Sequence, residues 1–479
     1  MTDVAPVQRS LPSSVNYTKI LPLAVESRSR RRTFLPNNGQ SFVSDLNNQI
    51  RIDISANAFL DTQHSYLRFR MRNTTGQNMS VDFSGGHGFI QRLRISQSGT
   101  ILSDVFNYGR LVGGILLPSQ IGTSAQGERS ITEGQRWCNA GGAAAASMAT
   151  AAPAEVSGAI AITPTNATNV VPAGSDYYFC IPLVNGLLGT TQSKMVPLQL
   201  LGSSPIQLEI TLANVSDVGV FAAPPNAYTI DECRYIGALV EVGAEVDQQL
   251  RAVQSASRGR LVLNGVDYTH FTGNFAAGTQ GNAVINIPAR KKSMKSLLWL
   301  GATQNFVAPV RSACFNLCWG GHLNMEEFYV KIGSLVYPQT PIRSNFRDNL
   351  ARQEASETLE ELAKCMGTLN SAHGVGCLTR MNCYVNDCDN GNCPVASVAG
   401  GATATHQFSP FGIDLEAFQK TALESGVDTS SRALQMSLHC VLGRDLGGGI
   451  AADPITIDAY VCYDSLYYID EAGRINVSQ

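Results

Sequence analysis

The stretch GGHGFIQRLRISQSGTILSDVFNYGRLVGGILL, residues 85–117, has the order strand, glycine turn, strand, short helix. Apolar residues in 90–95 approximate the two-residue alternation of a strand that is buried on one face. Gly99 supplies a turn residue that readily takes a positive φ. Residues 101–106 form a second predicted strand, and 107–117 then carry apolar residues at helical spacing.

The same order recurs later in the chain, where Gly333 stands 234 positions after Gly99. Strands are predicted at 328–332 and 335–337, and a helix follows over 345–366. Three more pairs of similar segments are 50–54 with 283–287, 66–71 with 296–301, and 205–212 with 433–440. A shared period of roughly 230 residues predicts two copies of one β module.

The composition favours an all-β protein that buries much of its surface. The chain has 479 residues, of which 44% are apolar and only 15% are charged, with 44 Gly and 20 Pro. This length accommodates two or three domains with full cores. Low charge is also typical of a chain that packs against copies of itself. The net charge of −3 gives no bulk attraction to nucleic acid.

The sequence contains no segment that resembles a secretory signal or a membrane span, so neither is expected. Several of the 12 cysteines lie within apolar strand patterns, among them Cys180, Cys440 and Cys462. Such positions predict small buried hydrophobic side chains in a reducing compartment.

Residues 1–40 are predicted to form an N-terminal basic arm, because they contain prolines and no sustained period. Its basic side chains of interest are Arg28, Arg30, Arg31 and Arg32. One interpretation is a solvated tail. The other is an arm that joins neighbouring subunits or faces an acidic interior such as packed DNA.

The first β module is predicted to span residues 41–222 and the second 223–479, with a boundary at Pro224-Pro225. Small residues dominate 118–176, which predicts one long loop that projects from the first module. A strand at 235–245 is assigned to the second module. Asn264-Gly265 then predicts a hairpin turn.

The strand at 66–72, YLRFRMR, alternates basic and apolar side chains. A half-exposed strand is favoured here over a nucleic-acid-binding face, because no aromatic stacking platform accompanies it.

Four cysteines form the strongest local cluster of candidate ligands: Cys377, Cys383, Cys388 and Cys393. Their spacing differs from the paired knuckles of structural zinc sites. Free thiols, loop disulfides and a metal clip all stay open for them.

The sequence contains no motif of a zinc hydrolase, a serine-hydrolase elbow or a phosphate-binding loop, so no catalytic residue and no cofactor is expected. An alternative is a tandem β-sandwich that binds or hydrolyses carbohydrate. That class needs paired carboxylates or an aromatic platform in a cleft, and the chain has only 3 Trp.

Four segments together resemble one protein family: FIQRLRISQSGTILSDVFNYGRL at 89–111, FCIPLVNGLLG and MVPLQLL within 179–201, YVKIGSLVYPQTPI at 329–342, and FGIDLEAFQKTALESGVDTS at 411–430. The chain resembles the double jelly-roll major capsid proteins of eukaryotic double-stranded DNA viruses, in the group of polinton-like viruses, adintoviruses and virophages.

This resemblance implies two tandem eight-stranded antiparallel jelly rolls with short helical insertions and long apical loops. Residues 118–176 and the Cys-rich 377–408 would be two of these loops. Three copies would form a pseudo-hexagonal capsomer of an icosahedral shell around a double-stranded DNA genome.

The implied partners are the chain itself, as homotrimers and neighbouring capsomers, together with penton and minor capsid proteins. The N-terminal arm would meet genomic DNA or an inner membrane. The implied location is the virion capsid, assembled in the host cytoplasm or nucleus.

Overall fold

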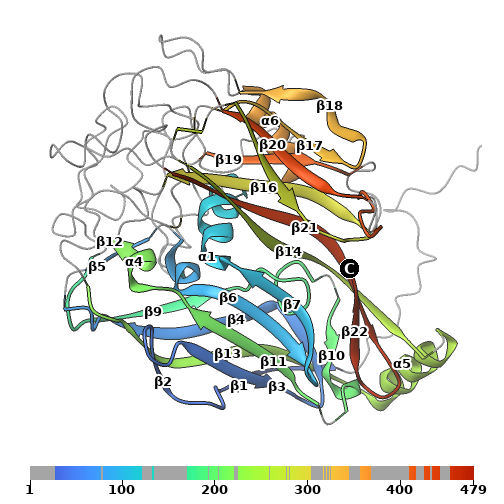
Figure 1. Cartoon of the computed structure of the whole chain (residues 1–479). Helices are drawn as coiled ribbons and strands as arrows, with labels where there is room; N and C mark the ends of the chain where they lie inside the picture. Colours follow the sequence, from blue (N-terminus) through green and yellow to red (C-terminus); the bar gives the residue numbers. More distant parts are fainter. Residues whose placement is uncertain are drawn as a thin grey trace, which may run out of the picture.

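The computed structural model contains two β-sandwiches, drawn one above the other in Figure 1. It describes residues 27–76, 79–82, 84–120, 132–133, 170–192, 194–202, 204–220, 225–257, 259–276, 278–279, 281–303, 317, 320, 323, 325–344, 356–367, 409–416, 426–431, 434–442 and 454–479.

The first roll consists of two facing antiparallel sheets. Sheet 1 has the order β1-β13-β4, and β9 and β10 both pair with β4 while β2 pairs with β13. Sheet 2 has the order β3-β11-β6-β7. The strands of sheet 1 are β1 (Ser27–Phe34), β2 (Ser41–Val43), β4 (Phe59–Arg72), β9 (Asp176–Ile181), β10 (Val196–Pro197) and β13 (Thr229–Val242). Those of sheet 2 are β3 (Gln49–Ile54), β6 (Ile90–Gln97), β7 (Thr100–Phe106) and β11 (Ile206–Leu212).

The second roll repeats this arrangement. Sheet 3 has the order β14-β21-β16-β19, with β22 paired to β21, and sheet 4 has the order β15-β20-β17-β18. The strands of sheet 3 are β14 (Leu261–Phe275), β16 (Met294–Thr303), β19 (Pro410–Asp414), β21 (Ile455–Ile469) and β22 (Ile475–Ser478). Those of sheet 4 are β15 (Gly281–Ile287), β17 (Met325–Ile332), β18 (Leu335–Arg343) and β20 (Met436–Leu442).

The eight long strands of each roll follow the same path. Counted along the chain within a roll, one sheet joins the first, eighth, third and sixth strands, and the other joins the second, seventh, fourth and fifth. This order is that of a jelly roll, so the predicted duplication and the double jelly-roll fold are confirmed. The two predicted turns correspond as well, because Gly99 and Gly333 both take a positive φ, 80° and 61°.

Short helices and a small sheet complete the described structure. The helical elements are η2 (Gly85–Phe89), α1 (Tyr108–Arg110), the π-helical turn η3 (Leu111–Leu116), α2 (Leu117–Gln120), η4 (Leu198–Leu200), α4 (Val215–Val218), α5 (Ala244–Ala256) and α6 (Ser356–Cys365). The small sheet contains β12 (Gly219–Val220), β5 (Met79–Val81) and β8 (Val170–Val171). Helix α5 connects the two rolls.

Alternating side chains build the core of each roll. In β11 every second residue is buried, as period-two patterning requires. The second core, between sheets 3 and 4, contains Trp299 stacked on Phe411 with the ring centroids 5.5 Å apart. The first core is larger and extends across the boundary between the rolls, because it includes buried residues of sheet 3 such as Tyr460 and Tyr467.

The predicted N-terminal arm is wrong for residues 27–34. They form β1, whose residues pair in continuous register with β13, from Ser27 opposite Val242 to Phe34 opposite Tyr235. The strand is hard to recognise in the sequence because it lies at a sheet edge, where seven of its eight side chains are exposed and only Phe34 is buried. Residues 1–26 lie outside the described residues.

The predicted boundary at Pro224-Pro225 is also wrong. Strand β13 comes after it and still belongs to the first roll, since it pairs with β1 and β4. The first roll therefore ends at Val242, and the prolines precede its last strand. Residues 261–275 are likewise one continuous strand rather than a hairpin at Gly265.

Two further predictions fall mostly or wholly outside the described residues. These are the long loop at 118–176, of which 118–120, 132–133 and 170–176 are described, and the Cys-rich loop at 377–408. Of the helix predicted at 345–366, the described part begins with α6 at Ser356.

Candidate assembly surfaces and the joint between the rolls

A buried polar cluster joins the two rolls. Arg110 of α1 lies with its Nε 2.6 Å from Asp458 Oδ2 of β21, and these side chains are only 7% and 9% exposed. His270 Nε2 of β14 lies 2.8 Å from the other carboxylate oxygen, Oδ1. The Tyr460 hydroxyl donates to the backbone oxygen of Asn107 at 3.0 Å. Figure 1 shows α1 between the first roll and sheet 3.

The cluster keeps Asp458 ionised although the residue is buried. Burial by itself raises the pKa of this carboxyl, but the charge of Arg110 and the contact with His270 outweigh it, so the pKa lies below its ordinary value. A carboxylate inside an apolar strand, ITIDAYVCY, is the one sequence signal that could have indicated this joint. Arg110, His270 and Asp458 are not among the site residues predicted from the sequence.

Backbone contacts also hold the rolls together. Gly265 of β14 approaches Gly186 of the first roll so closely that a Cβ on Gly265 would lie 1.9 Å from the Gly186 oxygen. The chain end adds contacts, because the Ile475 amide donates to Gln97 Oε1 at 2.7 Å and the Gln97 amide donates to the Gly473 oxygen at 3.1 Å. With their shared core, the two rolls form one body.

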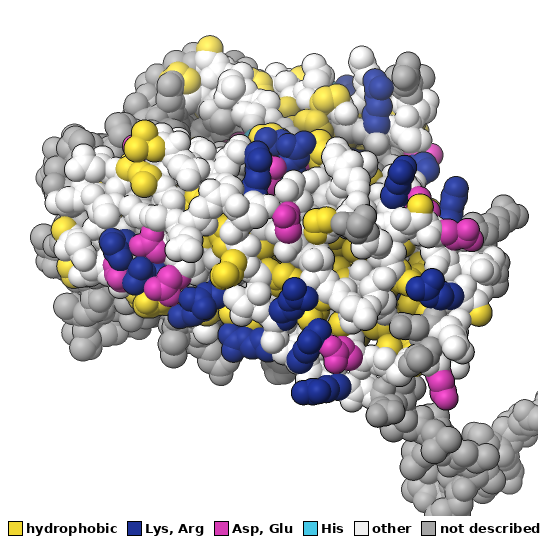
Figure 2. Space-filling view, turned by 90° about the horizontal axis from the view of Figure 1, so that it is seen from below, with side chains coloured by type: hydrophobic (Ala, Val, Ile, Leu, Met, Phe, Trp, Pro, Cys, Tyr) yellow, Lys and Arg dark blue, Asp and Glu magenta, His cyan; other side chains and the backbone are white. Residues whose placement is uncertain are grey.

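The outward side of sheet 1 is basic and partly aromatic. Tyr66 and Arg68 alternate along β4 with buried Leu67 and Phe69 and therefore point away from the core. We call the outward side chains of Arg31, Tyr66, Arg68, Tyr178 and Arg234 the basic face. Figure 2 views the side of the molecule where β1 and β13 lie, and Lys and Arg side chains extend along it.

Stacking holds two arginines of the basic face in place. The Arg31 guanidinium lies 5.7 Å from the ring centroid of Tyr66, and that of Arg68 lies 5.2 Å from Tyr178. Among the described residues, neither arginine has an ion pair. Near one end of the sheet, by contrast, Arg70 pairs with Asp231 and Glu232. Arg234 also has an ion pair, with Glu232 at 3.1 Å. Among the arginines of the basic face, those without an ion pair in the described part of the chain are thus Arg31 and Arg68.

The four arginines predicted to belong to an arm all lie on β1, in different surroundings. Arg30 pairs with Glu241 of β13 at 2.8 Å, and Arg31 belongs to the basic face. Arg32 lies 5.1 Å from the ring centroid of Phe34 and also lines a pocket. Arg28 is exposed. The structure therefore places them on a sheet and not on a free segment.

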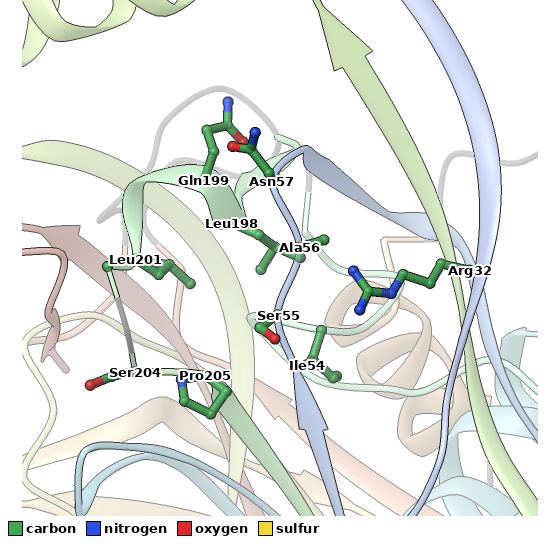
Figure 3. Close-up of a pocket in the computed structure, with 11 residues that line it drawn as sticks. Arg32, Ile54, Ser55, Ala56, Asn57, Leu198, Gln199, Leu201, Ser204 and Pro205 are labelled. Carbon is green, nitrogen blue, oxygen red and sulfur yellow. The ribbon is translucent and has the colours of Figure 1, made fainter.

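The pocket beside Arg32 has a volume of about 340 Å³ and opens at the end of the first roll (Figure 3). Its apolar side chains are Ile54, Ala56, Leu198, Leu201 and Pro205, and its polar side chains include Asn57, Gln199 and Ser204. No carboxylate, histidine, cysteine or aromatic ring lines it. It therefore lacks the paired acids of a hydrolase and the ring platform of a sugar-binding cleft.

The described cysteines Cys180, Cys233, Cys365, Cys440 and Cys462 form no disulfide, and burial raises the pKa of Cys462 to about 12. In the described part of the chain, no three His, Cys, Asp or Glu side chains come together as metal ligands could. Cys377, Cys383, Cys388 and Cys393 lie outside that part. No helix within the described ranges is long and apolar enough to cross a bilayer.

Several solved viral capsid proteins share this fold over more than nine-tenths of their length. The PBCV-1 protein VP54, as fitted into a reconstruction of the virophage Sputnik, matches with a TM-score of 0.56 and 12% identity, covering 97% of this chain and 99% of that one. The Faustovirus major capsid protein matches with a TM-score of 0.54 and 8% identity, covering 96% and 92%. The mavirus major capsid protein matches with a TM-score of 0.50 and 11% identity, covering 100% and 95%. No family model matches the sequence, and no curated protein matches it.

Proposed function

We propose that this chain is the major capsid protein of an icosahedral double-stranded DNA virus, and that three copies form each capsomer. The observation that carries the proposal is a duplicated jelly roll whose two copies are locked into one body. The similarity in fold to capsid proteins, which extends over nearly the full length of both chains, supports it.

The mechanism under this proposal is assembly and not catalysis. Two rolls of the same topology occupy neighbouring positions, so three copies supply six rolls for one pseudo-hexagonal position with closed three-fold symmetry. A rigid joint between the rolls fixes their relative angle, which such closure requires. The buried Arg110–Asp458 pair and the Gly186–Gly265 contact supply that rigidity.

The remaining partners are also part of the proposal. Neighbouring capsomers, penton proteins and minor capsid proteins would contact the assembled trimer in the virion capsid. Contact with genomic DNA or an inner membrane stays a prediction for residues 1–26. Assembly in the host cytoplasm or nucleus is proposed on the same basis.

The mass of the purified protein in solution tests the proposal. Light scattering after size exclusion is expected to give a trimer of about 154 kDa, three times the 51.3 kDa of one chain. Electron micrographs of the same fraction are expected to show particles with a pseudo-hexagonal outline. A monomer whose melting temperature rises with added sugar would instead support the tandem-sandwich alternative.

A further inference from the structure

The internal duplication allows the two outward sheet faces to be compared position by position. In the first roll, Arg68 of β4 pairs with Arg234 of β13. At the equivalent place in the second roll, Leu298 of β16 pairs with Tyr460 of β21. On one side of these pairs the core-facing neighbours correspond in register, Leu67 with Tyr235 in sheet 1 and Leu297 with Val461 in sheet 3; on the other side a register shift between Asp231 and Arg234 interrupts sheet 1. The basic face is thus the counterpart of the outward face of sheet 3.

These two equivalent faces differ in what covers them. On sheet 3, Leu298 and Tyr460 are buried at 2% and 0% exposure. The first roll packs on this face, and Leu362 of α6 packs on it beside Leu298. On sheet 1, Tyr178 is 45% exposed, and Arg68 and Arg234 are partly exposed. The outward face of sheet 3 is therefore covered within the chain, whereas the described residues leave the equivalent face of sheet 1 partly exposed.

The element that covers sheet 3 has its own counterpart in the second roll. Helix α1 follows β7 and places Arg110 against Asp458 of sheet 3. In the second roll the helix that follows β18 is α6, which packs against β19 through buried Leu362. The outward side of α6 carries exposed Glu357, Leu359 and Glu360.

The charges of the two open surfaces are complementary. The basic face presents Arg31 and Arg68, which have no ion pair among the described residues. Helix α6 presents Glu360 and also Glu357, whose carboxylate accepts a hydrogen bond from the Arg343 amide at 3.1 Å. In the joint inside the chain the signs are reversed, because the helix supplies the arginine and the sheet the carboxylate. Leu359, 39% exposed, adds apolar area to this surface of α6.

We propose that α6 of a second copy of this chain packs on the basic face, as α1 packs on sheet 3. The contact is heterologous, since two different surfaces meet. If neighbouring rolls of two copies meet at the same angle as the two rolls within one chain, repetition of the contact closes a ring of three copies. This inference rests on the proposed function and names the surfaces that make the trimer.

Charge reversal tests the contact on the full-length protein. Arg68→Glu and Glu360→Lys are each expected to raise the concentration at which the trimer dissociates at least 10-fold, measured by light scattering. Circular dichroism is expected to show the same β content in every variant, because both side chains are on the surface. The charge-swapped double variant is expected to recover trimer, which a folding defect would not produce. Arg51→Glu, an exposed arginine on sheet 2, serves as the matched control and is expected to leave the trimer unchanged.

Other results of these measurements would contradict the basic face, α6 or the trimer itself. An Arg68→Glu variant that is as trimeric as the wild type, or an equal loss in the Arg51→Glu control, removes the basic face as the contact. A swapped variant that recovers no trimer removes α6 as the partner. A wild-type chain that stays at monomer mass refutes the proposed function as well.

Discussion

The substitution Asp458→Asn probes the joint between the rolls most directly. It keeps the size of the side chain but removes the negative charge that lies 2.6 Å from Arg110. Because both side chains are more than nine-tenths buried, the substitution takes the carboxylate of Asp458 away from the buried guanidinium of Arg110. Breaking a buried ion pair from one side costs about 3–5 kcal/mol.

A second pair of the same chemistry supplies the control. Arg92 and Asp104 join β6 and β7, with Nε and Oδ1 2.7 Å apart, but their side chains are 28% and 21% exposed. Asp104→Asn is therefore expected to cost only about 0–1 kcal/mol. Both pairs join an arginine to an aspartate at hydrogen-bonding distance, so the comparison contrasts a buried cluster, which also includes His270, with a partly exposed pair.

Urea denaturation followed by tryptophan fluorescence measures the difference, because Trp299 reports on the second core. With a denaturant slope of roughly 3 kcal/mol/M, the expected loss for Asp458→Asn lowers the midpoint by about 1 M or more. A smaller loss in the variant Arg110→Met/Asp458→Leu would show that the charge kept on Arg110 in Asp458→Asn, and not the lost contact, is responsible. The reasoning is refuted if Asp458→Asn costs no more than Asp104→Asn.

Three more expectations follow from buried groups and from β1. Burial raises the pKa of Asp82 from 3.8 to about 6. Ionisation of Asp82 therefore lowers the stability of the folded chain above pH 6, and lowering the pH toward 4 removes that loss. Asp82→Asn is expected to flatten the pH dependence of the melting temperature between pH 4 and 7. Gly265→Ala is expected to cost about 3 kcal/mol, since its Cβ would meet the backbone oxygen of Gly186, and an unchanged melting temperature would contradict the close approach of the rolls. Deletion of residues 1–26 is expected to leave the melting temperature unchanged. Deletion of 1–36 is expected to lower it, because this truncation removes β1 and exposes the edge of sheet 1. Equal melting curves for the two truncations would argue against β1 as part of the sheet.

The sequence by itself determined the repeating β architecture. Period-two burial in strands such as β6 and β11, and turn glycines at equivalent places in two modules, depend only on neighbouring residues. Those local signals were enough to predict two copies of one β module, each containing a strand, a glycine turn, a second strand and a helix. The four segments that resemble capsid proteins added the jelly-roll path, which local patterning does not contain.

Only the tertiary structure decided which strands complete the first roll and how the rolls meet. Residues 27–34 have no apolar alternation, and they form a strand because β13, some 200 positions later, offers its free edge. The joint depends on contacts such as that of Asn107 with Asp458, 351 positions apart. Such pairs leave no periodic trace in either segment, because their geometry arises only when the folded sheets bring distant residues together.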